Sequence, residues 1–161
     1  NPIPVDEALA ILREGAKRQR KFSPKAILLG YILAAAFFCA FFGGTVRDFF
    51  CAGVTGLAVG LCVLYGQPVM GSNGFFRTVI CSAVAALLPM IFVAVGVGDH
   101  QDLITIGVLM LLVPGMALTN AMREIMAGDI ISGVNRTAEV ILVATAIAIG
   151  TALPLMIARL L

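Results

Sequence analysis

The ionisable side chains that could do chemistry are concentrated in one stretch of an otherwise apolar sequence. This stretch contains two cations, Arg123 and Arg136, and three acids, Glu124, Asp129 and Glu139. Guanidinium groups bind carboxylates, and carboxylates bind ammonium groups or carry protons. With all five groups ionised the charges sum to −1, two positive against three negative, which favours a zwitterion or a proton-coupled site over a free dianion.

Uncharged polar residues accompany these charges at helical spacing. Residues three and four positions apart are neighbours on a helix surface, which places four side chains on one side of a predicted helix: Thr119, Asn120, Arg123 and Glu124. Gly128 is predicted to end this helix, and Arg136 and Glu139 beyond it are three residues apart and could form an ion pair. The candidate binding residues are therefore Thr119, Asn120, Arg123, Asp129, Ser132, Asn135, Arg136 and Glu139, with Glu124 and Asp48 as weaker candidates.

A helix break precedes the polar segment. Pro114 lacks an N–H group and disfavours helix at the residue before it, and Gly115 lets the chain turn. The apolar run 103–113 ahead of the break covers roughly half of a hydrocarbon core of about 30 Å. Two interpretations stay open: the polar residues line a water-filled cavity in a helical bundle, or 116–136 is a cytoplasmic loop with a surface helix and solvated charges.

The composition places the chain among polytopic membrane proteins. Of its 161 residues, 60% are hydrophobic and 12% are charged, whereas soluble domains are about 45–50% apolar and about 25% charged. Apolar runs long enough to cross a bilayer, or nearly so, lie at 26–46, 49–65, 78–97 and 141–157. The predicted fold is all-α: a bundle of about five transmembrane helices with short links, the fourth broken at Pro114-Gly115, preceded by an amphipathic helix.

The chain divides into two predicted parts. Residues 1–25 are expected to form an amphipathic cytoplasmic helix and a basic junction, and residues 26–161 the five-helix transmembrane module. Basic residues beside a span mark the cytoplasmic side, so the amino end is placed inside, which leaves only Arg47 and Arg159 of the 11 Lys and Arg residues outside. Because the sequence starts at Asn1 without methionine, we expect it to be a processed or truncated part of a longer protein.

The remaining sequence features predict packing rather than chemistry. The four cysteines lie in apolar runs without a C-x-x-C pair and are expected to be small apolar fillers: Cys39, Cys51, Cys62 and Cys81. His100, the only histidine, is expected to be a solvated loop residue. Small residues at four-residue spacing predict a helix-packing seam, either within the fold or between subunits: Ala52, Gly56 and Gly60. We expect no metal site, no cofactor and no enzyme activity, because no metal-ligand, nucleotide-binding or catalytic motif is present.

The run VPGMALTNAMREIMAGDIISGVNRTAE, followed by Ala148-Ile149-Gly150, resembles the membrane module of the threonine/serine exporter family. DEALAILREG and FFGGTVRDFF also resemble family segments, so the resemblance covers nearly the whole chain. It points to these functional positions: Pro114, Gly115, Thr119, Asn120, Arg123, Asp129, Ser132, Gly133, Arg136 and Glu139, and more weakly Asp48. It also implies that the chain is the first of two five-helix modules, which are either fused or encoded separately.

The resulting hypothesis is a membrane subunit of a secondary exporter that moves a small polar metabolite, with threonine or serine expected, outward across the bacterial inner membrane. Arg123 or the start of the restarted helix would hold a carboxylate, and Asp129 or Glu139 would hold an ammonium group or carry a proton. Expected partners are the solute, the lipid bilayer, and a second exporter module or another copy of the chain, but no nucleic acid. The alternatives are a subunit exporting dicarboxylates such as succinate, and a membrane scaffold that transports nothing.

Overall fold

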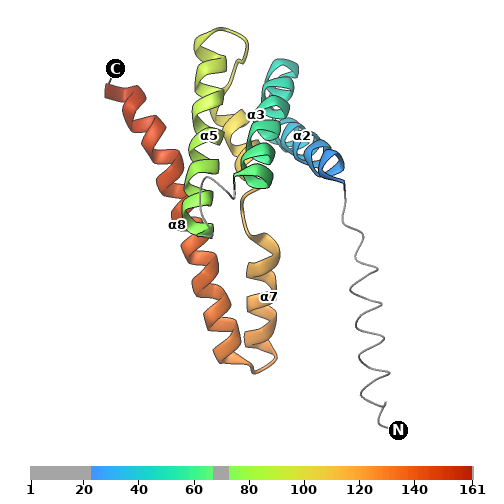
Figure 1. Cartoon of the computed structure of the whole chain (residues 1–161), viewed down its shortest axis with the longest axis vertical. Coiled ribbons are helices and arrows are strands. Elements are labelled where there is room, and N and C mark those ends of the chain that lie inside the picture. Colours follow the sequence, from blue (N-terminus) through green and yellow to red (C-terminus); the bar gives the residue numbers. More distant parts are fainter. Residues whose placement is uncertain (1–22, 67–72, 161) are drawn as a thin grey trace.

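The computed structural model describes residues 23–66 and 73–160, and these residues form helices without any strand (Figure 1). The helices are α2 (Pro24–Phe41), α3 (Val46–Tyr65), α5 (Gly74–Ala94), α6 (Gln101–Leu109), α7 (Gly115–Met126) and α8 (Ile130–Leu160). The predicted all-α fold class is confirmed. The amphipathic helix predicted within residues 1–25 lies outside the described residues, except for its last positions, where α2 begins.

Four of the helices are long and apolar enough to cross a membrane: α2, α3, α5 and α8. They correspond to the four long apolar runs of the sequence, with ends displaced by a few residues except at the start of α8, which begins at Ile130 rather than near 141. The remaining two helices, α6 and α7, lie on either side of Pro114. The 9 residues of α6 rise about 14 Å, roughly half of a hydrocarbon core. A fifth crossing built from α6 and α7 therefore stays a prediction.

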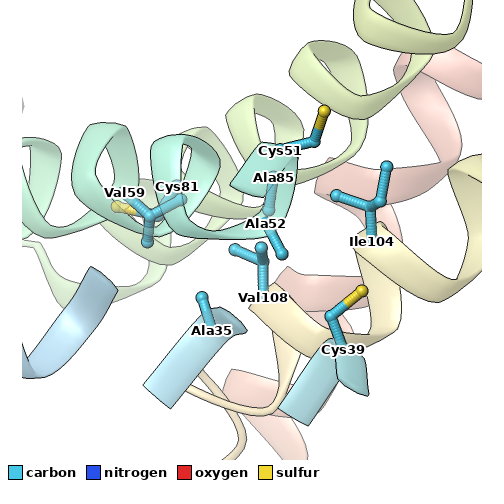
Figure 2. Close-up of a cluster of buried hydrophobic side chains, with 9 residues drawn as sticks. All are labelled: Ala35, Cys39, Cys51, Ala52, Val59, Cys81, Ala85, Ile104 and Val108. Atoms are coloured by element: carbon cyan, nitrogen blue, oxygen red, sulfur yellow. The ribbon is translucent and has the colours of Figure 1, made fainter. Parts of the chain in front are cut away.

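The short helix α6 lies at the centre of the bundle, packed against α2, α3 and α5. Its Ile104 and Val108 side chains are fully buried, and a Cβ atom added at Gly107 would lie 2.7 Å from the backbone nitrogen of Cys39 in α2. The buried cluster around it consists mainly of small side chains (Figure 2): Ala35, Cys39, Cys51, Ala52, Val59, Cys81, Ala85, Ile104 and Val108. Small side chains let helix backbones approach closely in a membrane protein.

The small-residue seam of α3 packs within this chain. A Cβ atom added at Gly56 would lie 2.6 Å from the Cβ of Ala35 and 2.7 Å from the carbonyl oxygen of Tyr31, both in α2. A Cβ atom added at Gly60 would meet the Tyr31 side chain at 3.0 Å. The seam predicted from the sequence therefore joins α3 to α2. Of the two alternatives, packing within the fold and packing between subunits, the structure shows the first.

The long helix α8 connects the bundle to a hairpin that extends away from it (Figure 1). The second half of α8 packs against α5, and its first half packs against α7. At the first contact, a Cβ atom on Gly150 would collide with Ser82; at the second, a Cβ atom on Gly133 would collide with Ile125. Residues 132–136 precede the last long apolar run of the sequence, but they lie inside α8, because the helix is capped at Asp129 and begins at Ile130.

Candidate functional site

Polar side chains gather in two places at opposite ends of the molecule. One is the α7–α8 hairpin, which holds most of the binding residues predicted from the sequence. The other is a cluster around Asp48, where the turn between α2 and α3 meets the turn between α5 and α6. In Figure 1 the α5–α6 turn lies at the top of the molecule and the hairpin at the bottom.

The hairpin is closed by a tight turn at Ala127-Gly128-Asp129. Gly128 has a φ angle of 92°, a left-handed conformation that commonly ends helices, as the sequence predicts. The Asp129 carboxylate accepts a hydrogen bond of 3.2 Å from the backbone N–H of Ser132 at the start of α8. Asp129, a predicted binding residue, thus caps a helix in this structure.

Arg136 and Glu124 form the ion pair of the hairpin. A guanidinium nitrogen of Arg136 lies 3.3 Å from Oε1 of Glu124. The other carboxylate oxygen, Oε2 of Glu124, is buried and has no hydrogen-bond partner among the described residues. The sequence spacing allows Arg136 to pair with Glu139, but in the structure Arg136 is turned towards α7 and pairs with Glu124. Glu124, a weaker candidate in the sequence, is therefore paired across the hairpin.

The other predicted binding residues lie separately along the hairpin. Arg123, Ser132, Asn135 and Glu139 are exposed, and Asn120 is half-buried. The Thr119 hydroxyl donates a hydrogen bond of 3.0 Å to the carbonyl of Gly115 in its own helix. Pro114 precedes the first residue of α7, which is Gly115. The structure thus brings Glu124 together with Arg136 and Asp129 together with Ser132, and it distributes the rest over an open surface.

Apolar side chains are also exposed on this hairpin. The most exposed are Met116 (80%), Met126 (85%) and Ile131 (78%). Patches that combine exposed apolar and charged residues mark surfaces that contact lipid or another protein. The hairpin therefore presents exposed apolar side chains beside charged ones to its surroundings.

At the opposite end, Asp48 and Thr45 cap α3 reciprocally. The Thr45 hydroxyl accepts a hydrogen bond of 3.3 Å from the Asp48 N–H, and the Asp48 carboxylate accepts one of 3.0 Å from the Thr45 N–H. This capping box satisfies two backbone N–H groups that a helix start leaves unpaired. It also holds the fully buried Asp48 side chain in one orientation.

The Asp48 carboxylate also accepts hydrogen bonds from the α5–α6 turn. Its Oδ1 atom accepts from the backbone N–H groups of Asp99 (2.8 Å) and His100 (3.0 Å). Its Oδ2 atom lies 3.0 Å from Nδ1 of His100. Arg47 lies 3.6 Å from the Asp99 carboxylate at the exposed edge of the cluster. Asp48 therefore ties together two turns that are about fifty residues apart in the sequence.

His100 is half exposed, as expected, but it is not simply solvated. Its side chain is 51% accessible, and its hydrogen bond to Asp48 raises the pKa of the imidazole above the ordinary value. The Thr45-x-x-Asp48 spacing is a sequence signal for the capping box. No sequence signal indicates the contact with His100, because it depends on how two distant turns meet.

Two cavities in the described part of the chain lie away from the hairpin residues. A groove of about 440 Å³ opens between α6 and α8, with polar walls at Gln101, Asp102, Thr105 and Thr151. An apolar hollow of about 300 Å³ lies along α2, around Tyr31. Neither is lined by a binding residue predicted from the sequence.

These features together define a polytopic, all-helical membrane protein with polar sites at both ends of its bundle. The family model described as "Putative threonine/serine exporter" matches residues 1–158, and the chain belongs to this family, which is one of transporters rather than enzymes. Pheromone-regulated membrane protein 10 of Debaryomyces hansenii is 29% identical over 139 residues, which cover 81% of this chain and 13% of that protein. No solved structure matches the chain. The family inferred from the sequence is confirmed.

Proposed function

We propose that this chain is a membrane module of a secondary exporter that moves threonine or serine out of the cytoplasm. Its family membership supports export of a small solute across a membrane. The charges of the hairpin, which sum to −1, favour a zwitterionic amino acid over a free dicarboxylate. In this proposal the membrane is the bacterial inner membrane, and the amino end lies in the cytoplasm.

The interruption between α6 and α7 is the main structural observation that supports the proposed export function. Since α6 begins at the end of the bundle that holds Asp48 and rises only about 14 Å, the chain leaves it near the middle of a 30 Å core. α7 then starts at Gly115 without a side-chain cap. Unpaired backbone groups at that depth need water or a polar solute, and a helix start favours an anionic group such as a carboxylate.

In this proposal α6 and α7 form a broken fourth crossing, so the chain crosses the membrane five times. The start of α7 or Arg123 holds the carboxylate of the solute, and Asp129 or Glu139 holds its ammonium group or carries a proton. The Glu124–Arg136 pair orients the hairpin, with one carboxylate oxygen left to accept a further hydrogen bond.

A second module or a second copy of the chain completes the site over the exposed hairpin. The open distribution of the hairpin residues and the exposed Met116 and Met126 support this part of the proposal. The match to the yeast relative covers 13% of that protein, so much more chain accompanies the matched segment there.

Counterflow in proteoliposomes tests the function. Vesicles loaded with unlabelled serine would contain this chain alone or with a second module of the family, and uptake of labelled threonine would be measured. We expect Arg136→Ala to reduce counterflow at least tenfold, and the charge exchange Glu124→Arg with Arg136→Glu to restore part of it. Lys25→Gln, an exposed change at the start of α2, serves as the matched control.

Each alternative has its own outcome in this assay. Uptake of labelled succinate into succinate-loaded vesicles, without counterflow of threonine against serine, would make the chain a dicarboxylate exporter. No counterflow of any of these solutes, with either protein composition, would favour a scaffold and contradict the exporter. Full activity of Arg136→Ala and of Arg123→Ala would remove these residues from the mechanism.

A further inference from the structure

We propose that the groove between α6 and α8 is a binding site for the ammonium group of the exported solute and forms the half of its path nearest the Asp48 cluster. This inference rests on the proposed export function and adds a site and a charge preference to it. None of the groove residues belongs to the polar segment that suggested the function.

The groove exists because α6 and α8 both pack against α5 and leave a space of about 440 Å³ between them. This volume lies within the range of small-molecule pockets, roughly 300–1,000 Å³. Its apolar walls are Ile106 and Leu109 of α6 and Leu155 of α8. A solute that carries a short carbon chain could lie against them while its polar groups face the other walls.

The polar groups of the groove come from both helices. Asp102 and Gln101 lie in the first turn of α6, Thr105 lies one turn further, and Thr151 faces them from α8. The two hydroxyl groups donate to backbone carbonyls of their own helices, Thr105 to Gln101 and Thr151 to Ile147. Because each hydroxyl proton is used in this way, each hydroxyl oxygen can act towards a solute as a hydrogen-bond acceptor.

The negative charge of the groove favours a ligand with a positively charged group. Asp102 is the one charged residue among those that line it. Of its charged neighbours, Asp99 is paired with Arg47, and His100 is bonded to Asp48. A carboxylate with hydroxyl acceptors binds an ammonium group and repels a dianion. The site therefore fits an amino acid and disfavours a free dicarboxylate.

Thiol labelling tests the groove without any transport assay. Cysteine would be introduced at Thr105 or Thr151, with Ile149→Cys as the matched control on an exposed part of α8 outside the groove, in the chain reconstituted in vesicles. We expect both groove cysteines to react several-fold faster with a cationic thiosulfonate than with an anionic one of similar size. Asp102→Asn should abolish this preference. The parent chain, whose native cysteines are buried or half-buried, sets the background.

Two further measurements complete the experiment: protection of the introduced cysteine by solutes, and counterflow of the Asp102 variants. Serine or threonine should slow labelling at Thr151→Cys at least threefold, and succinate should not. In counterflow, Asp102→Asn should raise the KM at least fivefold, while Asp102→Glu should largely restore it. Labelling of Thr151→Cys no faster than of Ile149→Cys, or no protection by either amino acid, would overturn the site.

The two proposals fail in different ways. If wild-type protein counterflows threonine and Asp102→Asn does so with unchanged KM, the groove is excluded and the exporter stands. If no counterflow occurs but the groove labels with charge preference and is protected by amino acids, the groove stands and the export function fails.

Discussion

Asp48 shows how a buried carboxylate is accommodated in a chain with so few polar partners. Its side chain is fully buried, and its two oxygen atoms accept from backbone N–H groups of Thr45, Asp99 and His100 and lie within hydrogen-bond distance of the His100 ring. Such bonds compensate for lost hydration and fix the position of every group that donates. The residue therefore has a structural role that is independent of any solute.

Replacing Asp48 should be costly. Asp48→Ala removes the acceptor of several backbone donors, and we expect a loss of about 2–4 kcal/mol in the free energy of unfolding. Asp48→Asn should cost nearly as much, because its NH₂ group would face donors. Thermal unfolding in detergent measures both, with the exposed Glu139→Gln as the control. Wild-type stability of Asp48→Ala would contradict the role of this cluster.

His100 should make the stability of the cluster depend on pH. Its hydrogen bond to Asp48 raises the pKa of the folded protein's imidazole above the ordinary 6.5. The charged form therefore stabilises the fold fully below about pH 6.5, and this stabilisation is lost as the pH rises through the folded pKa. The thermal midpoint of wild-type protein should therefore decrease as the pH is raised from about 5.5 through the pKa of the folded protein's imidazole.

His100→Ala provides the comparison, since this is the only histidine in the sequence. The variant should have a lower thermal midpoint at acidic pH and a flatter profile. The role of the His100–Asp48 contact would be contradicted if the thermal midpoint of wild-type protein rose with pH over this range. It would also be contradicted if His100→Ala left the dependence of the midpoint on pH unchanged.

At the scale of the residue, sequence spacing located polar groups but not their partners. The spacing of Arg136 and Glu139 suggested a pair along one helix, whereas the structure pairs Arg136 with Glu124 across the hairpin. Helical spacing describes neighbours within an element. Partners on another element depend on the turn at Gly128, whose geometry sets the register between α7 and α8.

At the scale of the element, glycines report how closely the helices approach each other. Gly107→Ala should destabilise the protein by about 1–3 kcal/mol, because its Cβ atom would lie 2.7 Å from a backbone atom of Cys39 and would push α6 away from α2. Gly30→Ala in α2 is the matched control, since nothing lies within 4 Å of its added Cβ. Thermal unfolding of the two variants measures the difference, and equal midpoints would exclude the close contact.

Gly115 behaves differently from the glycines of the core. The sequence suggested that it allows the turn at the break, but it is the first residue of α7, and a Cβ atom there would meet nothing within 4 Å. Gly115→Ala should therefore leave stability within about 0.5 kcal/mol of wild type. Gly128→Ala should cost about 1 kcal/mol or more, because Gly128 has a φ angle of 92°. A loss of stability in Gly115→Ala would show that the turn itself needs glycine.

The elements were largely predictable because apolar length sets the limits of a membrane helix. The four long runs became α2, α3, α5 and α8. The start of α8 was not predictable from hydropathy, since residues 130–140 are polar enough to resemble a loop. Their helix depends on the cap at Asp129 and on the packing of Gly133 against α7.

At the scale of the whole molecule, the two polar ends define a testable orientation. Val46 (76% exposed) lies at the end with the Asp48 cluster, and Met126 (85% exposed) lies in the hairpin. With the amino end in the cytoplasm, an impermeant thiol reagent added to intact cells should label Val46→Cys and leave Met126→Cys unlabelled until the membrane is opened. The reverse result would invert the proposed orientation.

The family and the class of the molecule could be predicted from its sequence, because composition and motifs are properties of the chain alone. The α6–α8 groove could not, since Asp102 and Thr151 are far apart in sequence and become neighbours only through α5. The same holds for the link between Asp48 and the α5–α6 turn. Both depend on the arrangement of helices, which apolar runs of similar composition leave undetermined.

The shortness of α6 has a consequence for biogenesis. A helix of 9 residues cannot be recognised by the insertion machinery as a membrane segment by itself, since about 20 apolar residues are needed. Its partners α2, α3 and α5 all precede it in the order of synthesis. In the proposed five-crossing topology, α6 therefore enters the bilayer after them, by docking into a space that they have already formed.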